Sequence, residues 1–154
     1  MKKIESFTID HTKLFAGLYV SRKDRKNGTC VTTFDLRFTA PNREKVMDTP
    51  AIHTIEHLGA TYLRNSQRAE DIVYFGPMGC RTGFYLVMFG DLESESVYEL
   101  VLKMCDFIIA FEGQIPGATA VECGNFSEQD LVGAKIYTKK YKSELETNKN
   151  FIYN

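Results

Sequence analysis

Two histidines that lie four residues apart are the strongest sign of chemistry in this sequence. They belong to the segment His53-Thr54-Ile55-Glu56-His57. On a helix this spacing directs both imidazole rings from one face, within reach of one ion, and imidazole is a common ligand of transition metals. Glu56 lies one residue from that face, where a carboxylate can move protons for groups that a metal polarises. The segment therefore predicts a metal site that still needs a third ligand.

Other interpretations of these histidines stay open. A solvated helical face can carry two histidines without binding a metal, and a metal site can be structural rather than catalytic. The same five-residue pattern also marks the inverted zinc peptidases. A chain of 154 residues leaves little room for a peptide cleft, however, and this chain offers cysteines in glycine-containing loops. A thiolate is therefore the third ligand that we consider first.

Cys123 is the candidate for that ligand. It precedes Gly124 in a loop just ahead of the last expected helix, where a permissive backbone can aim a thiolate at a metal. Cys80 lies in a second glycine-containing loop, next to Arg81, and a nearby cation or metal favours the thiolate form of a cysteine. We predict that Cys80 and Glu56 carry the proton transfers.

The alternative for every cysteine is a small buried hydrophobic residue, which is the commonest fate of a free thiol. Cys30, in an expected strand, and Cys105, in the apolar stripe of an expected helix, fit this alternative better than any function. We recognise no secretion signal, and the chain can bury a real core, so we expect a cytoplasmic protein with reduced thiols.

The elements that must position these groups follow from the periodicity of the sequence. Strands are expected at 29–39, 71–75 and 83–89, and helices from Pro50 after a Thr49 N-cap, over 93–111, and from a Ser127 N-cap to about 145. Cys80 then lies in the connection between two strands. The irregular order of strands and helices favours an α+β fold, with one domain over residues 1–154 and a largely antiparallel sheet packed against three or four helices.

The overall charge argues for a function in a local site. The formal net charge is -1, with both signs interspersed along the chain. Such a chain has no long-range field that would attract nucleic acid or an anionic membrane surface. No segment approaches the roughly 20 apolar residues that cross a bilayer. We therefore expect a small-molecule substrate and neither nucleic acid nor a membrane as partner.

Five sequence blocks, in the right order over nearly the whole chain, resemble one enzyme family. They are ESFTIDHTK at 5–13, DLRF followed by PN at 35–42, HTIEHL at 53–58, GPMGCRTGF at 76–84 and ECGN at 122–125. In these blocks the sequence is similar to the S-ribosylhomocysteine lyase (LuxS) family of bacterial methyl-cycle recycling and quorum-signal synthesis. One departure lies at Tyr74 to Gly76, where relatives often carry an aspartate and a serine.

The resemblance implies a role for each matched position. By this resemblance His53, His57 and Cys123 would bind a divalent metal, and Cys80 and Glu56 would carry out proton transfer. The substrate would be bound by Ser6, His11 and Arg37. The ordinary alternatives are a turn cap for Ser6, a backbone hydrogen bond for His11 and an exposed strand position for Arg37. We expect Arg37 to act on the substrate or on Cys80, because a guanidinium on a strand is a fixed cation.

The resemblance also implies the reaction and the assembly. Cleavage of S-ribosylhomocysteine would proceed by migration of a carbonyl along the sugar and β-elimination of the thioether. The products would be homocysteine and the dihydroxypentanedione precursor of autoinducer-2. A homodimer with sites at its interface is implied as well. Ligand chemistry alone favours zinc, whereas the resemblance points to ferrous iron, with zinc or cobalt as replacements.

Overall fold

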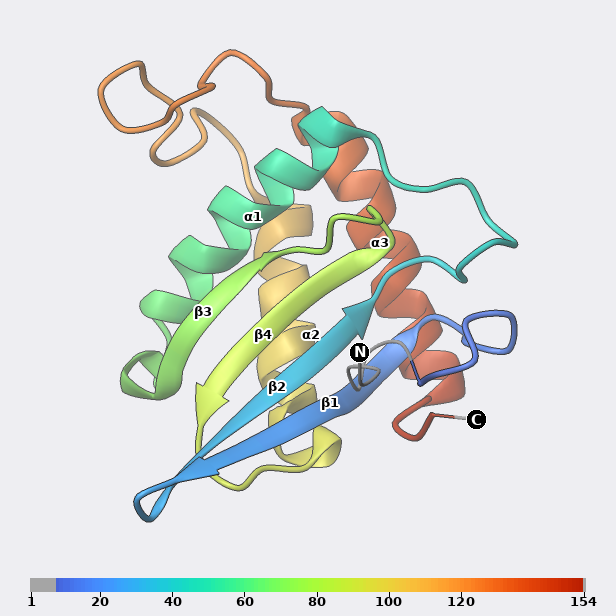
Figure 1. Cartoon of the computed structure of the whole chain (residues 1–154). Helices are drawn as coiled ribbons and strands as arrows, with labels where there is room; N and C mark the ends of the chain where they lie inside the picture. The colour runs from blue at the N-terminus through green and yellow to red at the C-terminus, as the bar shows by residue number, and fades with distance from the viewer. Residues whose placement is uncertain (1–7, 154) are drawn as a thin grey trace.

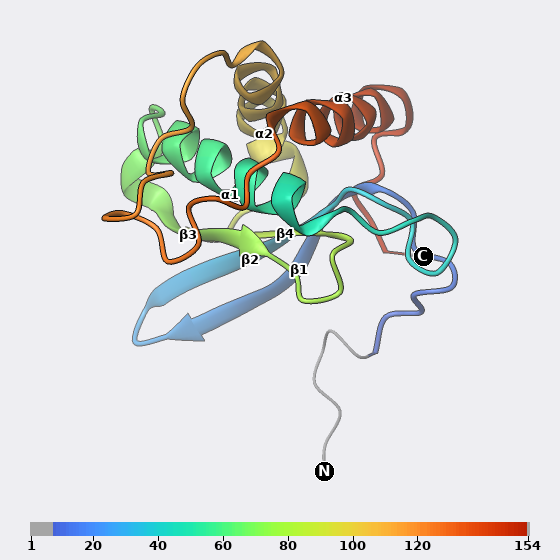
Figure 2. The same ribbon diagram turned by 90° about the horizontal axis from the view of Figure 1, so that it is seen from above.

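Three helices cover one face of a four-stranded antiparallel sheet (Figures 1 and 2). The structure is a computed structural model and describes residues 8–153. The strands are β1 (Gly17–Lys26), β2 (Thr29–Arg37), β3 (Ile72–Pro77) and β4 (Gly83–Phe89), in the order β1-β2-β4-β3. The helices are α1 (Thr49–Arg64), α2 (Ser94–Ala110) and α3 (Leu131–Asn148), with a short 3-10 turn, η2 (Ala69–Asp71). The predicted α+β class is confirmed.

The side chains of the two central strands show that the sheet has a core face and an open face. Phe34 on β2 and Leu86 on β4 are paired in the register and fully buried beneath the helices. Their sequence neighbours Asp35 and Tyr85 are also paired and point to the opposite face, because side chains alternate along a strand. No helix of the described residues covers that face (Figure 2). The alternation therefore sets polar side chains of β2 apart from the hydrophobic core.

Helix α1 carries the predicted metal motif over the sheet. Its apolar side, including Ile55 and Leu58, is buried in the core, which leaves His53 and His57 on the part-exposed side. The helix lies so close to β3 that a Cβ atom at Gly59 would be 2.4 Å from the Phe75 ring. A glycine at this position is what allows the helix to seat directly on the strand.

Strand β1 was not anticipated from the sequence. Its second half is a run of charged and polar residues on an exposed edge, so the alternation that marks a half-buried strand is absent there. A tight hairpin nevertheless connects it to β2, because Asn27 and Gly28 both adopt positive φ angles, 50° and 80°, which a type I′ turn requires.

Two helix starts differ from the sequence-based expectation. Helix α1 begins at Thr49 with Asp48 as its N-cap, one residue earlier than predicted. Helix α3 begins at Leu131 rather than after Ser127, and the Asp130 side chain caps it by accepting from the Gly133 N–H at 2.9 Å. The later start has a physical reason, because the preceding residues are engaged with α1.

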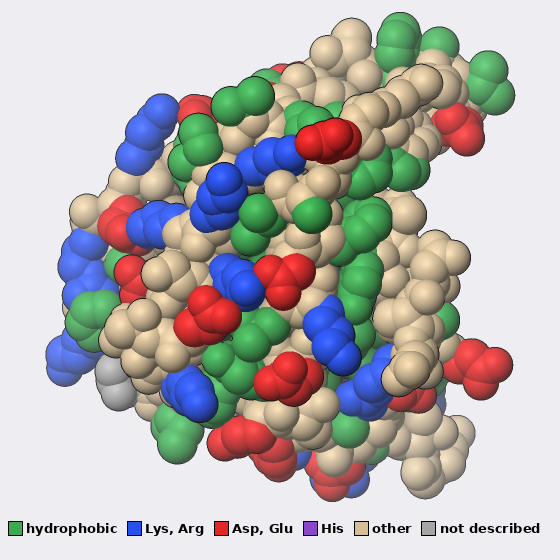
Figure 3. Space-filling model, turned by 180° about the vertical axis from the view of Figure 1, so that it is seen from behind, with side chains coloured by type: hydrophobic (Ala, Val, Ile, Leu, Met, Phe, Trp, Pro, Cys, Tyr) green, Lys and Arg blue, Asp and Glu red, His purple; other side chains and the backbone are tan. Residues whose placement is uncertain are grey.

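The outer surface of the helices is a solvated face. Seen from behind, it carries Lys and Arg side chains interspersed with Asp and Glu (Figure 3). Lys142 on α3 illustrates the pattern, since it lies 2.6 Å from Asp106 on α2 and 3.5 Å from Glu146. Within residues 8–153 no helix has both the length and the apolar character to cross a membrane.

Candidate metal centre and thiol pocket

The three predicted metal ligands come together in the structure. One ligand atom from each of His53, His57 and Cys123 lies within 4.8 Å of the other two. The two Nε2 atoms are 3.0 Å apart, and the Cys123 sulfur is 3.4 Å from Nε2 of His53. The i, i+4 spacing on α1 accounts for the first contact. The loop between α2 and α3 delivers the cysteine.

Backbone carbonyls orient both imidazole rings. Nδ1 of His53 lies 2.9 Å from the carbonyl oxygen of Glu128, and Nδ1 of His57 lies 2.8 Å from that of Pro116. The Gln129 amide also approaches Nδ1 of His53, at 3.2 Å, but the carbonyl is nearer. A neutral ring that donates from Nδ1 has a bare Nε2. Two such lone pairs facing each other beside a thiol fit a shared cation.

The same loop residues explain why α3 begins late. Asp130 donates its N–H to the Thr54 hydroxyl at 2.9 Å, and that hydroxyl donates to the Gln129 side-chain oxygen at 2.8 Å. These contacts, together with the His53 bond to Glu128, tie the segment before Leu131 to α1. The segment is therefore extended where the sequence alone predicted the first turn of a helix.

Glu56 lies beside this group. It lines a pocket of about 400 Å³ together with both histidines and Gly117. Gly117 has a φ of +71°, and a Cβ there would be 3.3 Å from Nδ1 of His57. Its positive φ and the lack of a side chain let the loop turn closely around the ring. The carboxylate of Glu56 is thus available to a molecule that reaches the ligand group.

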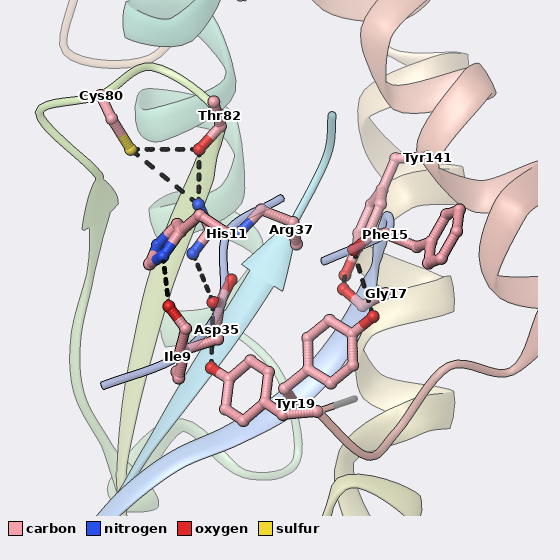
Figure 4. A network of polar contacts seen from close by, with 11 residues as sticks. Ile9, His11, Phe15, Gly17, Tyr19, Asp35, Arg37, Cys80, Thr82 and Tyr141 are labelled. Atoms are coloured by element: carbon pink, nitrogen blue, oxygen red, sulfur yellow. Dashed lines mark hydrogen bonds and ion pairs between the residues drawn. The ribbon is translucent and has the colours of Figure 1, made fainter. Parts of the chain in front are cut away.

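Cys80 lies in a different pocket, at the turn between β3 and β4. This pocket is about 470 Å³ and is also lined by His11, Arg37 and Thr82. Nη1 of Arg37 lies 3.9 Å from the Cys80 sulfur and 2.5 Å from the Thr82 hydroxyl, which is 3.1 Å from the same sulfur (Figure 4). Because the Thr82 oxygen accepts from Arg37, its own proton is free to point at the sulfur. The Cys80 sulfur therefore has a hydroxyl group and a guanidinium as its polar neighbours.

Arg37 is held by a buried ion pair. Nη2 lies 2.5 Å from Oδ2 of Asp35, and both side chains are almost fully buried. Burial raises the pKa of Asp35, whereas the charge and hydrogen bond of Arg37 and the hydroxyl of Tyr153 oppose that rise. The alternative of an exposed strand position for Arg37 is wrong. The cation beside Cys80 is Arg37, which is one of the two places where we expected it to act. Among the described residues, no contact joins Arg81 to the Cys80 thiol.

The remaining predicted residues have different outcomes. His11 makes the backbone contact that was its ordinary alternative, with Nδ1 at 2.9 Å from the Ile9 carbonyl oxygen, and it also lines the Cys80 pocket. Ser6 lies outside the described residues. Cys105 is fully buried, and burial raises the pKa of its thiol, which fits the structural alternative. Cys30 is half-buried in β2 and has no function suggested by its surroundings.

Sequence reasoning assigned no role to several residues that shape these pockets. Thr82 and Asp35 lie within the matched blocks, and their spacing of two from Cys80 and Arg37 is the only signal that could have drawn attention to them. The carbonyl oxygens of Pro116 and Glu128 leave no trace in residue type, because every residue has a carbonyl.

The family model for S-Ribosylhomocysteinase (LuxS) matches residues 4–151 of the chain. The chain belongs to the S-ribosylhomocysteinase (LuxS) family. Three similar proteins carry the name S-ribosylhomocysteine lyase. That of Finegoldia magna is 54% identical over 155 residues, 99% of each chain, and that of Desulfotalea psychrophila is 52% identical over 157 residues, again 99% of each. That of Borreliella burgdorferi is 56% identical over 142 residues, 92% of this chain and 90% of its own.

Because the chain belongs to the LuxS family, its five-residue metal motif needs no explanation by peptide hydrolysis. None of these relatives supports the peptidase interpretation.

The departure noted at 74–76 is structurally self-consistent. A Cβ at Gly76 would lie 1.9 Å from the Tyr74 hydroxyl oxygen, so the tyrosine ring occupies the space that a side chain at Gly76 would need. Neither residue lines the metal pocket or the Cys80 pocket.

Proposed function

We propose that the chain cleaves S-ribosylhomocysteine to homocysteine and the dihydroxypentanedione precursor of autoinducer-2. The observation that carries this proposal is the combination of a His-His-Cys ligand group with a pocket that sets a thiol beside a buried guanidinium. A hydrolytic peptidase has no use for the second feature, whereas a carbonyl migration needs a base for carbon-bound protons. The names of the relatives agree with this activity.

The ligand group suits a divalent metal, and we propose ferrous iron as the native ion, with zinc or cobalt as replacements in air. Two imidazole nitrogens and a thiolate form a donor set for such ions. When bound, the ion supplies a Lewis acid for the oxygen of the sugar carbonyl. His53, His57 and Cys123 would hold it, and the carbonyls of Glu128 and Pro116 would keep the rings in the ligating tautomer.

The chain's own side chains then move the protons. The Cys80 thiolate takes a proton from one sugar carbon and returns it to the neighbouring carbon, which shifts the carbonyl from the first to the second and then to the third position. Glu56 carries protons between the sugar oxygens. In the last step loss of a proton from the carbon next to the carbonyl breaks the carbon-sulfur bond, and the homocysteine thiolate leaves and is protonated. We assign substrate binding to Arg37, His11 and Ser6.

We also propose that a homodimer completes the site, because the two pockets share no lining residue. The open face of the sheet gives the chain a surface for a second copy, since Tyr74 and Phe89 on that face are about half exposed, 50% and 48%. Sedimentation equilibrium should give twice the monomer mass of 17.6 kDa. A monomer at micromolar concentration would refute the dimer.

Release of homocysteine tests the proposed reaction. Protein prepared without oxygen and loaded with ferrous iron should generate new free thiol from S-ribosylhomocysteine, as measured by thiol titration. The Cys80→Ala variant should generate almost none. Absence of thiol release by the iron-loaded wild-type protein would sink the lyase assignment, and peptide cleavage that survives Cys80→Ala would favour a peptidase.

A further inference from the structure

The last described residues of the chain are fastened to the start of β1. The Leu18 N–H donates to the Asn150 carbonyl oxygen at 2.9 Å, and the Asn150 side-chain amide donates to the Ala16 carbonyl oxygen at 2.9 Å. The approach is close, because a Cβ at Gly17 would be 2.6 Å from the Asn150 oxygen. This tail therefore has a defined place beside the start of β1.

Tyr153, at the end of that tail, reaches the buried ion pair. Its ring stacks on Tyr19 with the centroids 4.6 Å apart and the planes at 16°. Its hydroxyl donates to Oδ2 of Asp35 at 3.0 Å. Burial and the negative charge of Asp35 raise the pKa of Tyr153, so the hydroxyl keeps the proton that it donates.

Oδ2 of Asp35 thus accepts from two donors, the Tyr153 hydroxyl and Nη2 of Arg37. The other carboxylate oxygen, Oδ1, is buried without a hydrogen-bond partner among the described residues, and so is Nε of Arg37. The orientation of the guanidinium therefore depends on a small number of bonds, one to Asp35 and those toward Thr82 and Cys80. With so few bonds, each one contributes to fixing the guanidinium.

We propose that Tyr153 is a positioning residue for the Cys80 pocket: its hydroxyl fixes the Asp35 carboxylate, which in turn fixes the Arg37 guanidinium beside the Cys80 thiol. Without the hydroxyl, the carboxylate keeps only its bond to Arg37, so Nη1 of Arg37 is held less firmly toward Thr82 and Cys80. Tyr153 is more than seventy residues from Cys80 in sequence, and yet it then sets the reactivity of the Cys80 thiol. The inference rests on the proposed function only in treating Cys80 as the reacting group.

The Tyr153→Phe variant isolates the hydroxyl, because the ring can still stack on Tyr19. Alkylation of Cys80 by iodoacetamide at neutral pH, followed by mass spectrometry of the Cys80 peptide, should be about three- to tenfold slower than in the wild type, the factor expected for one hydrogen bond. Tyr19→Phe is the matched control, since its hydroxyl donates to the Phe15 carbonyl oxygen and not to Asp35. The control should alkylate Cys80 at the wild-type rate.

Two further measurements separate positioning from simple anchoring. The melting temperature of Tyr153→Phe should fall by only a few degrees, as for one lost hydrogen bond, whereas Tyr153→Ala, which also loses the stack, should melt lower still. The kcat for homocysteine release by Tyr153→Phe should fall by the same factor as the alkylation rate, with metal content unchanged.

The possible failures can be told apart. Equal or faster alkylation in Tyr153→Phe, or an equal slowing in Tyr19→Phe, would overturn the positioning role while leaving the lyase proposal standing. A wild-type protein that releases no homocysteine would overturn the lyase proposal, and the alkylation comparison would still report on the geometry around Cys80.

Discussion

The metal centre and the thiol pocket are built in different ways. The metal centre lies on a part-exposed helix face, and backbone carbonyls from the loop between α2 and α3 orient its rings. The thiol pocket lies on the sheet, where side chains hold other side chains. The buried Asp35 binds Arg37, Arg37 binds Thr82, and Thr82 contacts Cys80. A change in the first region should act on metal binding, and a change in the second should act on proton transfer without loss of metal.

Removal of the thiolate ligand should have the largest effect, and it tests whether the two regions have separate roles. Cys123→Ala should lose the metal and, with it, all measurable turnover, because only two imidazole ligands remain. Metal analysis after dialysis measures the first effect. The matched control is Cys30→Ala, a half-buried cysteine in β2 that should keep both metal and activity. Full metal content in Cys123→Ala would exclude this residue as a ligand.

The complementary change in the thiol pocket should have the opposite signature. Cys80→Ala should bind metal as the wild type does, yet its turnover should fall by about 10²- to 10⁴-fold, the usual contribution of a general acid-base group. Metal analysis and homocysteine release on the same sample provide the comparison. Loss of metal from Cys80→Ala would contradict the division between the two regions.

The two regions also differ in how much of each the sequence could reveal. His53 and His57 were predictable, because the i, i+4 spacing fixes their geometry as soon as the segment is helical. The strands expected at 29–39 and 83–89 were predictable from their composition and alternation, and they correspond to β2 and β4. The buried contacts of Asp35 with Arg37 and Tyr153 were not, since they depend on where the tail packs beside β1.

The errors of the sequence-based fold prediction have physical causes. Strand β1 was missed because its charged second half shows no apolar alternation, and pairing with β2 through a tight turn is what makes it a strand. Helix α3 was started too early because the sequence does not show that Glu128 and Asp130 are bound to α1. In both cases tertiary contacts decide the local structure.

Glu56 offers a finer test within the metal region. Glu56→Gln preserves the size of the side chain and removes its acid-base function, so metal should be retained while turnover falls by about 10²-fold and an intermediate accumulates. Rapid-quench analysis of the sugar products measures the accumulation. Glu128→Gln is the control, because that side chain bonds Asn125 and orients His53 only through its carbonyl. Unchanged turnover in Glu56→Gln would refute its role.

The smallest expected effect concerns the turn around His57. Gly117→Ala adds a Cβ 3.3 Å from Nδ1 of His57 at a φ of +71°. The displaced ring should bind metal about tenfold more weakly, as for other changes to groups that orient a ligand. Gly124→Ala is the control, since a Cβ there meets nothing within 4 Å. Competition with a metal chelator gives the metal affinities of both variants. Equal affinities would show that Gly117 is not needed to orient His57.

Mixing inactive subunits tests most directly whether the two regions act together across a homodimer. Cys80→Ala and Cys123→Ala proteins are inactive alone, and random exchange should make half of the dimers mixed. If the Cys80 pocket of one subunit works with the metal centre of the other, each mixed dimer contains one intact site, and exchange restores about a quarter of wild-type homocysteine release. No recovery, with mixed dimers confirmed by mass spectrometry, would contradict a site shared between the subunits.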